Sequence, residues 1–137
     1  MRYTITMQDS IFTKIIKDEI PCHKIYEDDT VLAFLDIHPI TTGHMLVVPK
    51  KQIEFLWDLD DETYQHVMAV AKKLSNHARV TLNVPFVGAQ VIGVDVPHAH
   101  IHIIPFTDVS EYHNVPDMSA EPNHGALSAT ARKLTLI

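Results

Sequence analysis

Residues 97–105 read PHAHIHIIP and place three histidines, His98, His100 and His102, at alternate positions between two prolines. Successive side chains of a β-strand point to opposite faces of the sheet. The pattern therefore predicts a strand with the three imidazoles on one face, neighbours about 6.6 Å apart, and small or apolar residues on the other face. Such a row of imidazoles is close enough to surround one small ligand group.

Four roles are open to these imidazoles. A plain polar sheet face is the minority interpretation for three consecutive histidines flanked by proline. A metal site is a serious rival, with His44 in GHMLVVPK and Asp36 as candidate further ligands. Acid–base chemistry suits an imidazole pKa of about 6.5. The fourth role is covalent catalysis, in which a neutral imidazole attacks an electrophile such as phosphorus. The residues by themselves leave these alternatives open.

The chain before the histidines shows helical and strand patterns. DSIFTKIIKDEIP, residues 9–21, begins with cap-type residues, repeats apolar residues at helical spacing and stops at Pro21, which predicts a short amphipathic helix. KIYEDDTVLAFLDI, residues 24–37, gives two β-prone runs separated by an acidic turn. GHMLVVPK, residues 43–50, adds a third strand.

A longer helix follows. Apolar residues recur at spacings of three and four from residue 58 or 60 to about residue 82, and the acidic start suits the positive end of a helix dipole. Residues 84–105 are rich in β-branched residues and interrupted by glycine, so we expect two further strands there. The order helix, three strands, helix, two strands predicts an antiparallel α+β fold. A polar stretch then leads to a weak terminal helix, ALSATARKL, residues 126–134.

Composition limits the class of protein. A chain of 137 residues, 46% of them hydrophobic, is expected to form a single domain, residues 1–137. The net charge of −6 argues against a broad surface for nucleic acid, and no apolar run approaches the length of a membrane span. The only cysteine, Cys22, has no intrachain partner, and the first ten residues lack the pattern of a secretion signal. We therefore expect a cytoplasmic protein with neither a nucleic-acid nor a membrane partner.

The motifs together resemble one known family. HAHIHII, residues 98–104, fits the pattern of the histidine triad (HIT) superfamily, and the chain is most similar to its small Hint-like branch. DSIFTKIIKDEIP, YEDDTVLAFLDIHP and GHMLVVPKK resemble the N-terminal helix and following strands of that family in order and spacing. The resemblance covers most of residues 9–105, whereas residues 107–137 form a divergent C-terminal tail.

The resemblance implies a fold and an activity. The fold is a five-stranded antiparallel sheet with two main helices, and two protomers join their sheets into one of ten strands. The implied function is a hydrolase that cleaves purine nucleoside phosphoramidates or related nucleotidyl substrates through a nucleotidyl-histidine intermediate, without a metal or another cofactor. Alternatives are a dinucleoside polyphosphate hydrolase and a non-catalytic nucleotide-binding module.

The resemblance also assigns roles to residues. His100 matches the nucleophile, His44 closes the site around it, and His98 and His102 flank the phosphate or protonate the leaving group. Asp36 matches the acid that accepts hydrogen bonds from the ribose hydroxyls, which suits an acceptor-only carboxylate. The residues that match positions around the base are Phe12, Ile15, Ile20, Phe34 and Ile37.

The chain departs from the family pattern in two segments besides the tail. Gly93-Val94-Asp95 stands where Gly-Gln-Ser is common, and an ionised Asp95 would oppose an anion. Asp9-Ser10-Ile11-Phe12, with Thr13 beside it, stands where some bacterial members carry a zinc-binding Cys-x-x-Cys. Because this segment has no thiolate, we expect no structural zinc.

Overall fold

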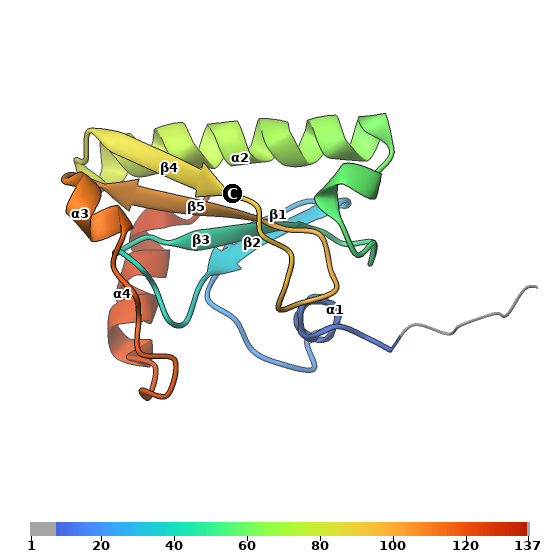
Figure 1. Cartoon of the computed structure of the whole chain (residues 1–137), viewed down its shortest axis with the longest axis horizontal. Helices are drawn as coiled ribbons and strands as arrows, with labels where there is room; N and C mark the ends of the chain where they lie inside the picture. Colours follow the sequence, from blue (N-terminus) through green and yellow to red (C-terminus); the bar gives the residue numbers. More distant parts are fainter. Residues whose placement is uncertain (1–7, 137) are drawn as a thin grey trace, which may run out of the picture.

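The computed structural model describes residues 8–136 and confirms the predicted antiparallel α+β fold. Five strands form one sheet in the order β1-β2-β3-β5-β4, and every neighbouring pair is antiparallel. The strands are β1 (Lys24–Glu27), β2 (Val31–Leu35), β3 (Met45–Pro49), β4 (Phe86–Gln90) and β5 (Ile101–Phe106). Within residues 8–136, β4 is the edge strand next to β5 (Figure 1).

The helices agree with the predicted order and add two short elements. They are α1 (Ile11–Ile16), the 3₁₀ helix η1 (Leu56–Asp58), α2 (Asp61–Leu82), α3 (Val109–Tyr112) and α4 (His124–Leu134). The long helix α2 lies where the apolar spacing placed it, and α4 begins two residues before the predicted terminal helix. Helix α3, a single turn closed by its own capping box, was not predicted.

The first helix is shorter than predicted, since it ends at Ile16 rather than near Pro21. Ser10 caps its start, where the side-chain oxygen accepts the Thr13 N–H. Asp18 then takes a left-handed backbone conformation with φ of 61°, which an α-helix does not continue through. The apolar side chains beyond that point belong to the loop before β1.

Both faces of the sheet are covered by helices, and the strands carry apolar side chains on both faces. Alternate residues of β2 join different clusters: Val31, Ala33 and Leu35 pack against α2 and α4, while Leu32 and Phe34 pack against α1. Figure 1 shows α2 along one side of the sheet and α1 on the opposite side. In the smaller cluster under α1, Phe12 contacts the histidine segment, and the candidate site lies there.

Strand β5 begins later than the alternating pattern predicted. Of the three histidines only His102 lies in the strand, and His98 and His100 precede it. The ladder with β3 ends at the pair Val47 and Ile101. One reason is that the last residue of β3 is a proline, which has no N–H for a further ladder bond.

The predicted alternation of faces survives this correction. Ala99, Ile101 and Ile103 are buried in the cluster under α2. His98 and His100 instead contact the ring of Phe12 on α1, with centroid distances of 5.8 and 5.1 Å. The histidine side chains therefore face α1 even where the main chain is not hydrogen-bonded as a strand.

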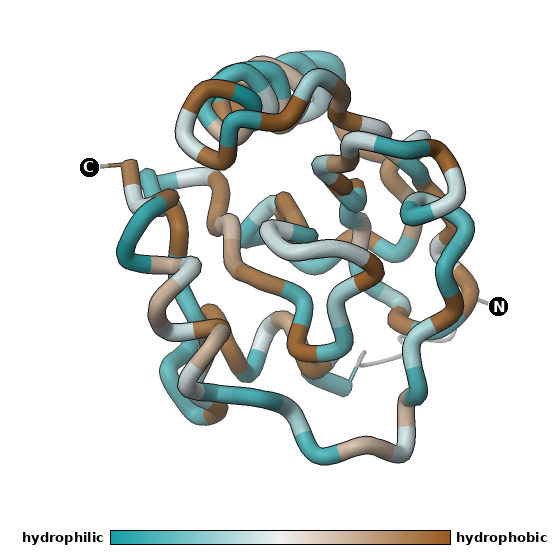
Figure 2. The backbone as a smooth tube through the Cα atoms, turned by 90° about the vertical axis from the view of Figure 1, so that its left-hand side faces the viewer, coloured by the Kyte–Doolittle hydropathy of each residue, from teal (hydrophilic) through white to brown (hydrophobic). Residues whose placement is uncertain are grey.

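Helix α2 has the amphipathic composition expected of a helix that covers a sheet. In Figure 2, α2 lies at the top of the picture and is viewed nearly along its axis, with brown and teal residues both visible on it. Its buried side chains come from positions such as Val67, Ala71 and Leu74. No helix among residues 8–136 is long and apolar enough to cross a membrane.

Candidate functional site

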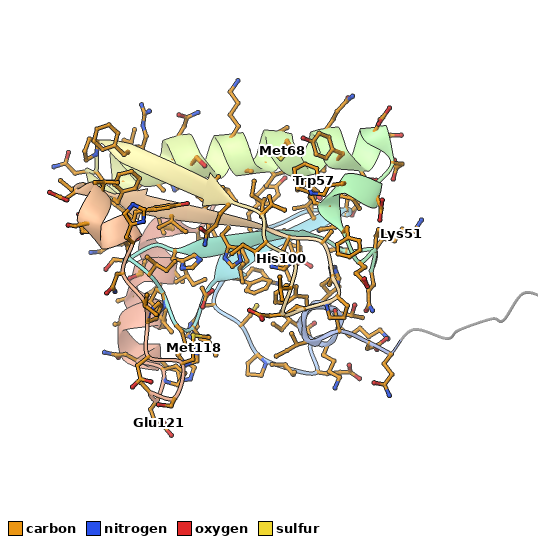
Figure 3. All side chains as sticks on the ribbon, in the orientation of Figure 1. Lys51, Trp57, Met68, His100, Met118 and Glu121 are labelled. Carbon is orange, nitrogen blue, oxygen red and sulfur yellow. The ribbon has the colours of Figure 1, made fainter. Side chains whose placement is uncertain are left out.

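A cavity of about 320 Å³ lies between α1 and the sheet, and two of the three alternate histidines, His100 and His102, line it. Three side chains in register form its floor, since Phe34 of β2 pairs with Leu46 of β3, and Leu46 pairs with His102 of β5. His100 also lines the cavity and lies near the middle of the molecule, between the sheet and the loop above α1 (Figure 3).

All six residues expected at a nucleoside line this one cavity. They are Phe12, Ile15, Ile20, Phe34, Ile37 and Asp36. The edge-to-face contact of the Phe12 and Phe34 rings, with centroids 5.6 Å apart, gives one wall an aromatic surface. The cavity therefore combines an apolar part, suited to a flat base, with one carboxylate.

His100 has a single available ring lone pair, and its position is fixed by the main chain. Its Nδ1 lies 2.6 Å from the carbonyl oxygen of His98. A carbonyl oxygen only accepts, so Nδ1 carries the hydrogen and the neutral ring keeps its lone pair on Nε2. No hydrogen bond within residues 8–136 engages that Nε2, which leaves it free to attack.

His98 has the opposite tautomer and no free nitrogen. Its Nε2 donates to the Pro49 carbonyl oxygen at 2.7 Å, and its Nδ1 lies 2.7 Å from the Ser10 hydroxyl. The ring is fully buried and does not line the cavity. Because both ring nitrogens are engaged, His98 has no ring nitrogen available for the predicted contact with a phosphate.

His44 and His102 form a directed pair. The Ile40 N–H donates to His44 Nδ1 at 3.0 Å, so the neutral His44 ring carries its hydrogen on Nε2. That Nε2–H donates to His102 Nδ1 at 2.9 Å. His102 in turn must carry its hydrogen on Nε2, which no other group within residues 8–136 engages. The pair therefore presents one N–H donor to the cavity.

Burial keeps this pair neutral. It lowers the pKa of His44 to about 4, and burial, with the neighbouring His44 and His100, lowers the pKa of His102 to about 4. Both rings are uncharged at neutral pH, which agrees with the tautomers that their hydrogen bonds require.

Asp36 lies beside the pair with one oxygen already used. Its Oδ1 accepts the His38 N–H at 2.8 Å, and its Oδ2 is 3.6 Å from His44 Nε2. Burial raises the pKa of this carboxyl, and the His38 N–H opposes the shift. The position of Oδ2 at the cavity suits acceptance from a sugar hydroxyl.

The segment before the triad brings a second carboxylate to the cavity. Gly93 has φ of 77°, a left-handed conformation that turns the chain. Asp95 lines the cavity two residues later, and its charge favours the protonated form of His102. No lysine or arginine is among the residues that line the cavity.

Comparison with known proteins agrees with this arrangement of fold and triad. The HIT domain family model matches residues 17–109, most of the chain. The chain belongs to the HIT family. It is 44% identical over 106 residues to an uncharacterized HIT-like protein of Borreliella burgdorferi, covering 72% of this chain and 76% of that one.

Two further relatives connect the HIT fold to a named activity and a solved structure. The chain is 40% identical over 99 residues to the adenosine 5′-monophosphoramidase HNT1 of Saccharomyces cerevisiae, covering 72% of this chain and 63% of that one. The crystal structure of a Hit-like protein involved in cell-cycle regulation from Bartonella henselae, with unknown ligand, is similar with a TM-score of 0.79 and 31% identity. That match covers 92% of this chain and 94% of the other.

The metal interpretation of this HIT site meets a specific obstacle. Ligand atoms of Asp36, His44 and His102 lie within 4.8 Å of one another. A metal at His44 Nε2 would need a lone pair there, but the Ile40 N–H already claims the lone pair on Nδ1. His44 and His102 are instead joined by a hydrogen bond, with Asp36 Oδ2 beside them at 3.6 Å from His44 Nε2.

Sequence reasoning missed several residues of the HIT site. Met118, which follows β5 in the chain, lines the cavity together with Cys22, and Figure 3 shows Met118 on the segment that leads to α4. Ser10 contacts the His98 ring through its hydroxyl, and Gln52 accepts the Ser10 N–H. Cap-type chemistry at Ser10 was visible in the sequence, but no local pattern signals that residues 10, 52 and 98 meet.

Proposed function

We propose that this protein hydrolyses purine nucleoside phosphoramidates through a nucleotidyl intermediate on His100. The observation that carries the proposal is the tautomer of His100. Its Nδ1–H is bound to the His98 carbonyl, so the lone pair on Nε2 faces the cavity that holds the candidate nucleoside contacts. A neutral imidazole with a free lone pair is a competent nucleophile toward phosphorus.

The chemistry divides into two displacements at the α-phosphorus. His100 Nε2 forms a bond to phosphorus while the bond to the amine nitrogen breaks. A water molecule at the cavity gives a proton to the departing amine and is left as hydroxide. That hydroxide attacks phosphorus, breaks the bond to Nε2 and releases the nucleoside monophosphate with His100 neutral again. His102 Nε2–H donates to a phosphate oxygen, where it offsets the developing negative charge.

The charges of the site favour an amine leaving group over a polyphosphate. Asp36 and Asp95 line the cavity, without lysine or arginine. His102 and the neighbouring His44 are neutral at pH 7 because burial lowers the pKa of each to about 4. A dinucleoside polyphosphate would bring extra negative charges toward Asp95, whereas an amine brings none. Phosphoramidate cleavage is therefore the preferred function, with polyphosphate cleavage as the alternative.

A substrate comparison in the presence of a chelator tests the proposal. The parent and His100→Ala are incubated with a fluorogenic adenosine phosphoramidate and with a diadenosine polyphosphate. We expect the parent to turn over the phosphoramidate faster, and His100→Ala to lose turnover while still binding AMP. His113→Ala is the matched control, because His113 is exposed in the tail.

Each other outcome has a definite meaning. Full activity of His100→Ala would remove His100 as the nucleophile. Loss of activity on adding the chelator to the parent would restore the metal interpretation. Binding of AMP without turnover of either substrate would favour the nucleotide-binding module. Mass spectrometry of the parent, quenched with denaturant at alkaline pH because acid cleaves a phosphorus–imidazole bond, is expected to find the nucleotidyl group on His100.

A homodimer belongs to the same proposal. β4 pairs only with β5 within the described chain, and Phe86 on this edge strand is half exposed. Pairing of two such edges would join two five-stranded sheets into one of ten and cover that surface. Sedimentation at micromolar concentration is expected to show a dimer, and a monomer alone would contradict this assembly.

A further inference from the structure

A partly buried cluster of polar side chains around the His98 ring joins three separate parts of the chain. Ser10 and Thr13 belong to the start of α1, Gln52 to the loop after β3, and His98 to the histidine segment. Ser10 and His98 are 6% and 0% exposed. None of these four side chains lines the nucleotide cavity, so the cluster lies outside the site where substrate would bind.

The donor and acceptor of most hydrogen bonds in the cluster follow from the groups that form them. Gln52 Oε1 accepts from the Ser10 N–H at 2.9 Å and from the Thr13 hydroxyl, while Gln52 Nε2 donates to the Gln8 carbonyl. The Thr13 N–H donates to Ser10 Oγ at 3.0 Å. The Ser10 hydroxyl has two acceptors within reach, Thr13 Oγ1 at 3.2 Å and His98 Nδ1 at 2.7 Å, and the shorter contact is the one to His98.

The tautomer of His98 requires that Ser10 be the donor in their hydrogen bond. Its Nε2 donates to the Pro49 carbonyl at 2.7 Å, so its Nδ1 holds a lone pair and needs a donor. Ser10 is that donor, since the Thr13 hydroxyl is engaged by Gln52. The ring of His98 is thus held at both nitrogens, by the end of β3 and by the start of α1.

The carbonyl of the same residue holds the nucleophile. His100 Nδ1–H donates to the His98 carbonyl oxygen at 2.6 Å, and this bond fixes which nitrogen keeps the lone pair. Phe12, two residues after Ser10, packs edge-to-face on the His98 and His100 rings. The start of α1 therefore contacts both the base cavity and the support of the nucleophile.

We propose that Ser10 is a positioning residue which, supported by Thr13 and Gln52, fixes the ring of His98 and through the His98 carbonyl aligns His100 for attack. This inference rests on the proposed function for its kinetic consequence, but the alignment itself is a property of the free protein. Without the hydroxyl, His98 Nδ1 is a buried acceptor without a donor, and the segment that presents His100 must shift or admit water.

Ser10 also caps α1, so its test must separate capping from positioning. Glycine at a helix N-cap loses only a few tenths of a kcal/mol relative to serine, which makes Ser10→Gly a variant that keeps the cap but lacks the hydroxyl. Ser10→Thr retains both functions. Asp60→Gly is the matched control, because Asp60 caps α2 in the same way and does not line the cavity.

Two measurements are made on these variants and on Thr13→Val and Thr13→Ser. Ring ¹⁵N NMR without substrate reads the tautomers of His98 and His100, with the His100 signal assigned by His100→Ala. Steady-state kinetics with an adenosine phosphoramidate reads kcat and KM. For Ser10→Gly we expect a mixed tautomer signal for His98, a kcat lower by about 10- to 100-fold, and a KM close to the parent value.

We expect Thr13→Val to show a smaller change in the same direction, and Ser10→Thr, Thr13→Ser and Asp60→Gly to resemble the parent. Parent-like tautomers in a folded Ser10→Gly would overturn the inference, as would an unchanged kcat. Absence of turnover in the parent would instead count against the proposed function, and the NMR measurement would still decide the inference. If Ser10→Gly does not fold, the pair Thr13→Val and Thr13→Ser decides it.

Discussion

The carbonyl oxygen of His98 lies 2.6 Å from Nδ1 of His100, so the first histidine of the triad fixes the proton of the second. A similar main-chain contact fixes His44, whose Nδ1 accepts the Ile40 N–H. His44, His98 and His102 carry their hydrogen on Nε2, whereas His100 carries it on Nδ1. Among them only His100 keeps a lone pair on Nε2.

Stability is expected to fall as pH falls from about 6.5 toward 4, partly because of His44. Burial lowers the pKa of His44 to about 4, whereas in the unfolded chain it is about 6.5. Between these values the unfolded chain binds the extra proton, so this contribution is fully present above pH 6.5 and lost on acidification. Its slope is at most about 1.4 kcal/mol per pH unit.

Urea unfolding of the parent and of His44→Gln at several pH values measures this contribution. The parent should lose more stability than His44→Gln between pH 6.5 and 4.5, because the variant lacks the titrating ring. Parallel curves for the two proteins would show that His44 is not held neutral by the fold.

Asp36→Asn is expected to weaken binding of AMP by about tenfold, an effect of roughly 1.4 kcal/mol that is typical of a hydrogen bond to a charged group. Asp36 Oδ2 lies at the cavity as an acceptor, and an amide in its place cannot offer the same charge. Calorimetry with AMP and with its 2′,3′-dideoxy analogue measures the difference.

The dideoxy analogue should bind the parent and Asp36→Asn about equally, because it has no hydroxyl to donate. Asp29→Asn, which changes an exposed turn residue, should leave both affinities unchanged. If Asp36→Asn lost affinity equally for AMP and for its dideoxy analogue, the effect would not come from a contact with the ribose hydroxyls.

Asp95→Asn is expected to increase the affinity for ATP severalfold while changing the affinity for AMP less. Asp95 lines the cavity that contains no lysine or arginine, so its removal should matter most for ligands with more negative charge. The ratio of the two dissociation constants, measured at low and high salt, checks this.

Glu54→Gln serves as the control for net charge, since Glu54 is exposed and outside the cavity lining. If it changes the ratio as much as Asp95→Asn does, the effect comes from the charge of the whole protein and not from the site.

Gly43→Ala is expected to destabilise the fold by about 1–3 kcal/mol and to reduce turnover. Gly43 has φ of 92°, and an added Cβ would lie 2.6 Å from a methyl carbon of Leu82. A shift of this residue moves His44, which follows it. Thermal unfolding and the phosphoramidate assay measure the two effects.

Gly125→Ala provides the opposite case. It lies in the first turn of α4, where an added Cβ meets only ordinary contacts. The substitution should stabilise the protein by about 0.4–1 kcal/mol, because alanine loses less backbone entropy on folding. Equal destabilisation by both substitutions would contradict the strain assigned to Gly43.

The sequence by itself determined the order of the elements and the family of the fold. Period-two and helical apolar patterns depend on neighbouring residues, so β2, β3 and α2 could be located from local spacing. The same spacing placed His102 on the sheet and grouped Phe12 and Ile15 on one helix. The turn at Asp18 and the single turn α3 were not predicted. Many different sequences adopt such short local conformations, so the apolar spacing does not reveal them.

Only the tertiary structure decided what each histidine can do. In sequence His98, His100 and His102 are equivalent members of one alternating row. Folding brings a serine hydroxyl to one ring, a carbonyl to the next and a distant histidine to the third. For His98 and His102 the ring nitrogen that carries the hydrogen depends on partners far away in the chain, Ser10 and His44, and no local pattern of residues contains that information. For His100 the partner is the carbonyl two residues earlier, but the backbone conformation that brings this carbonyl to the ring comes only with the folded loop before β5.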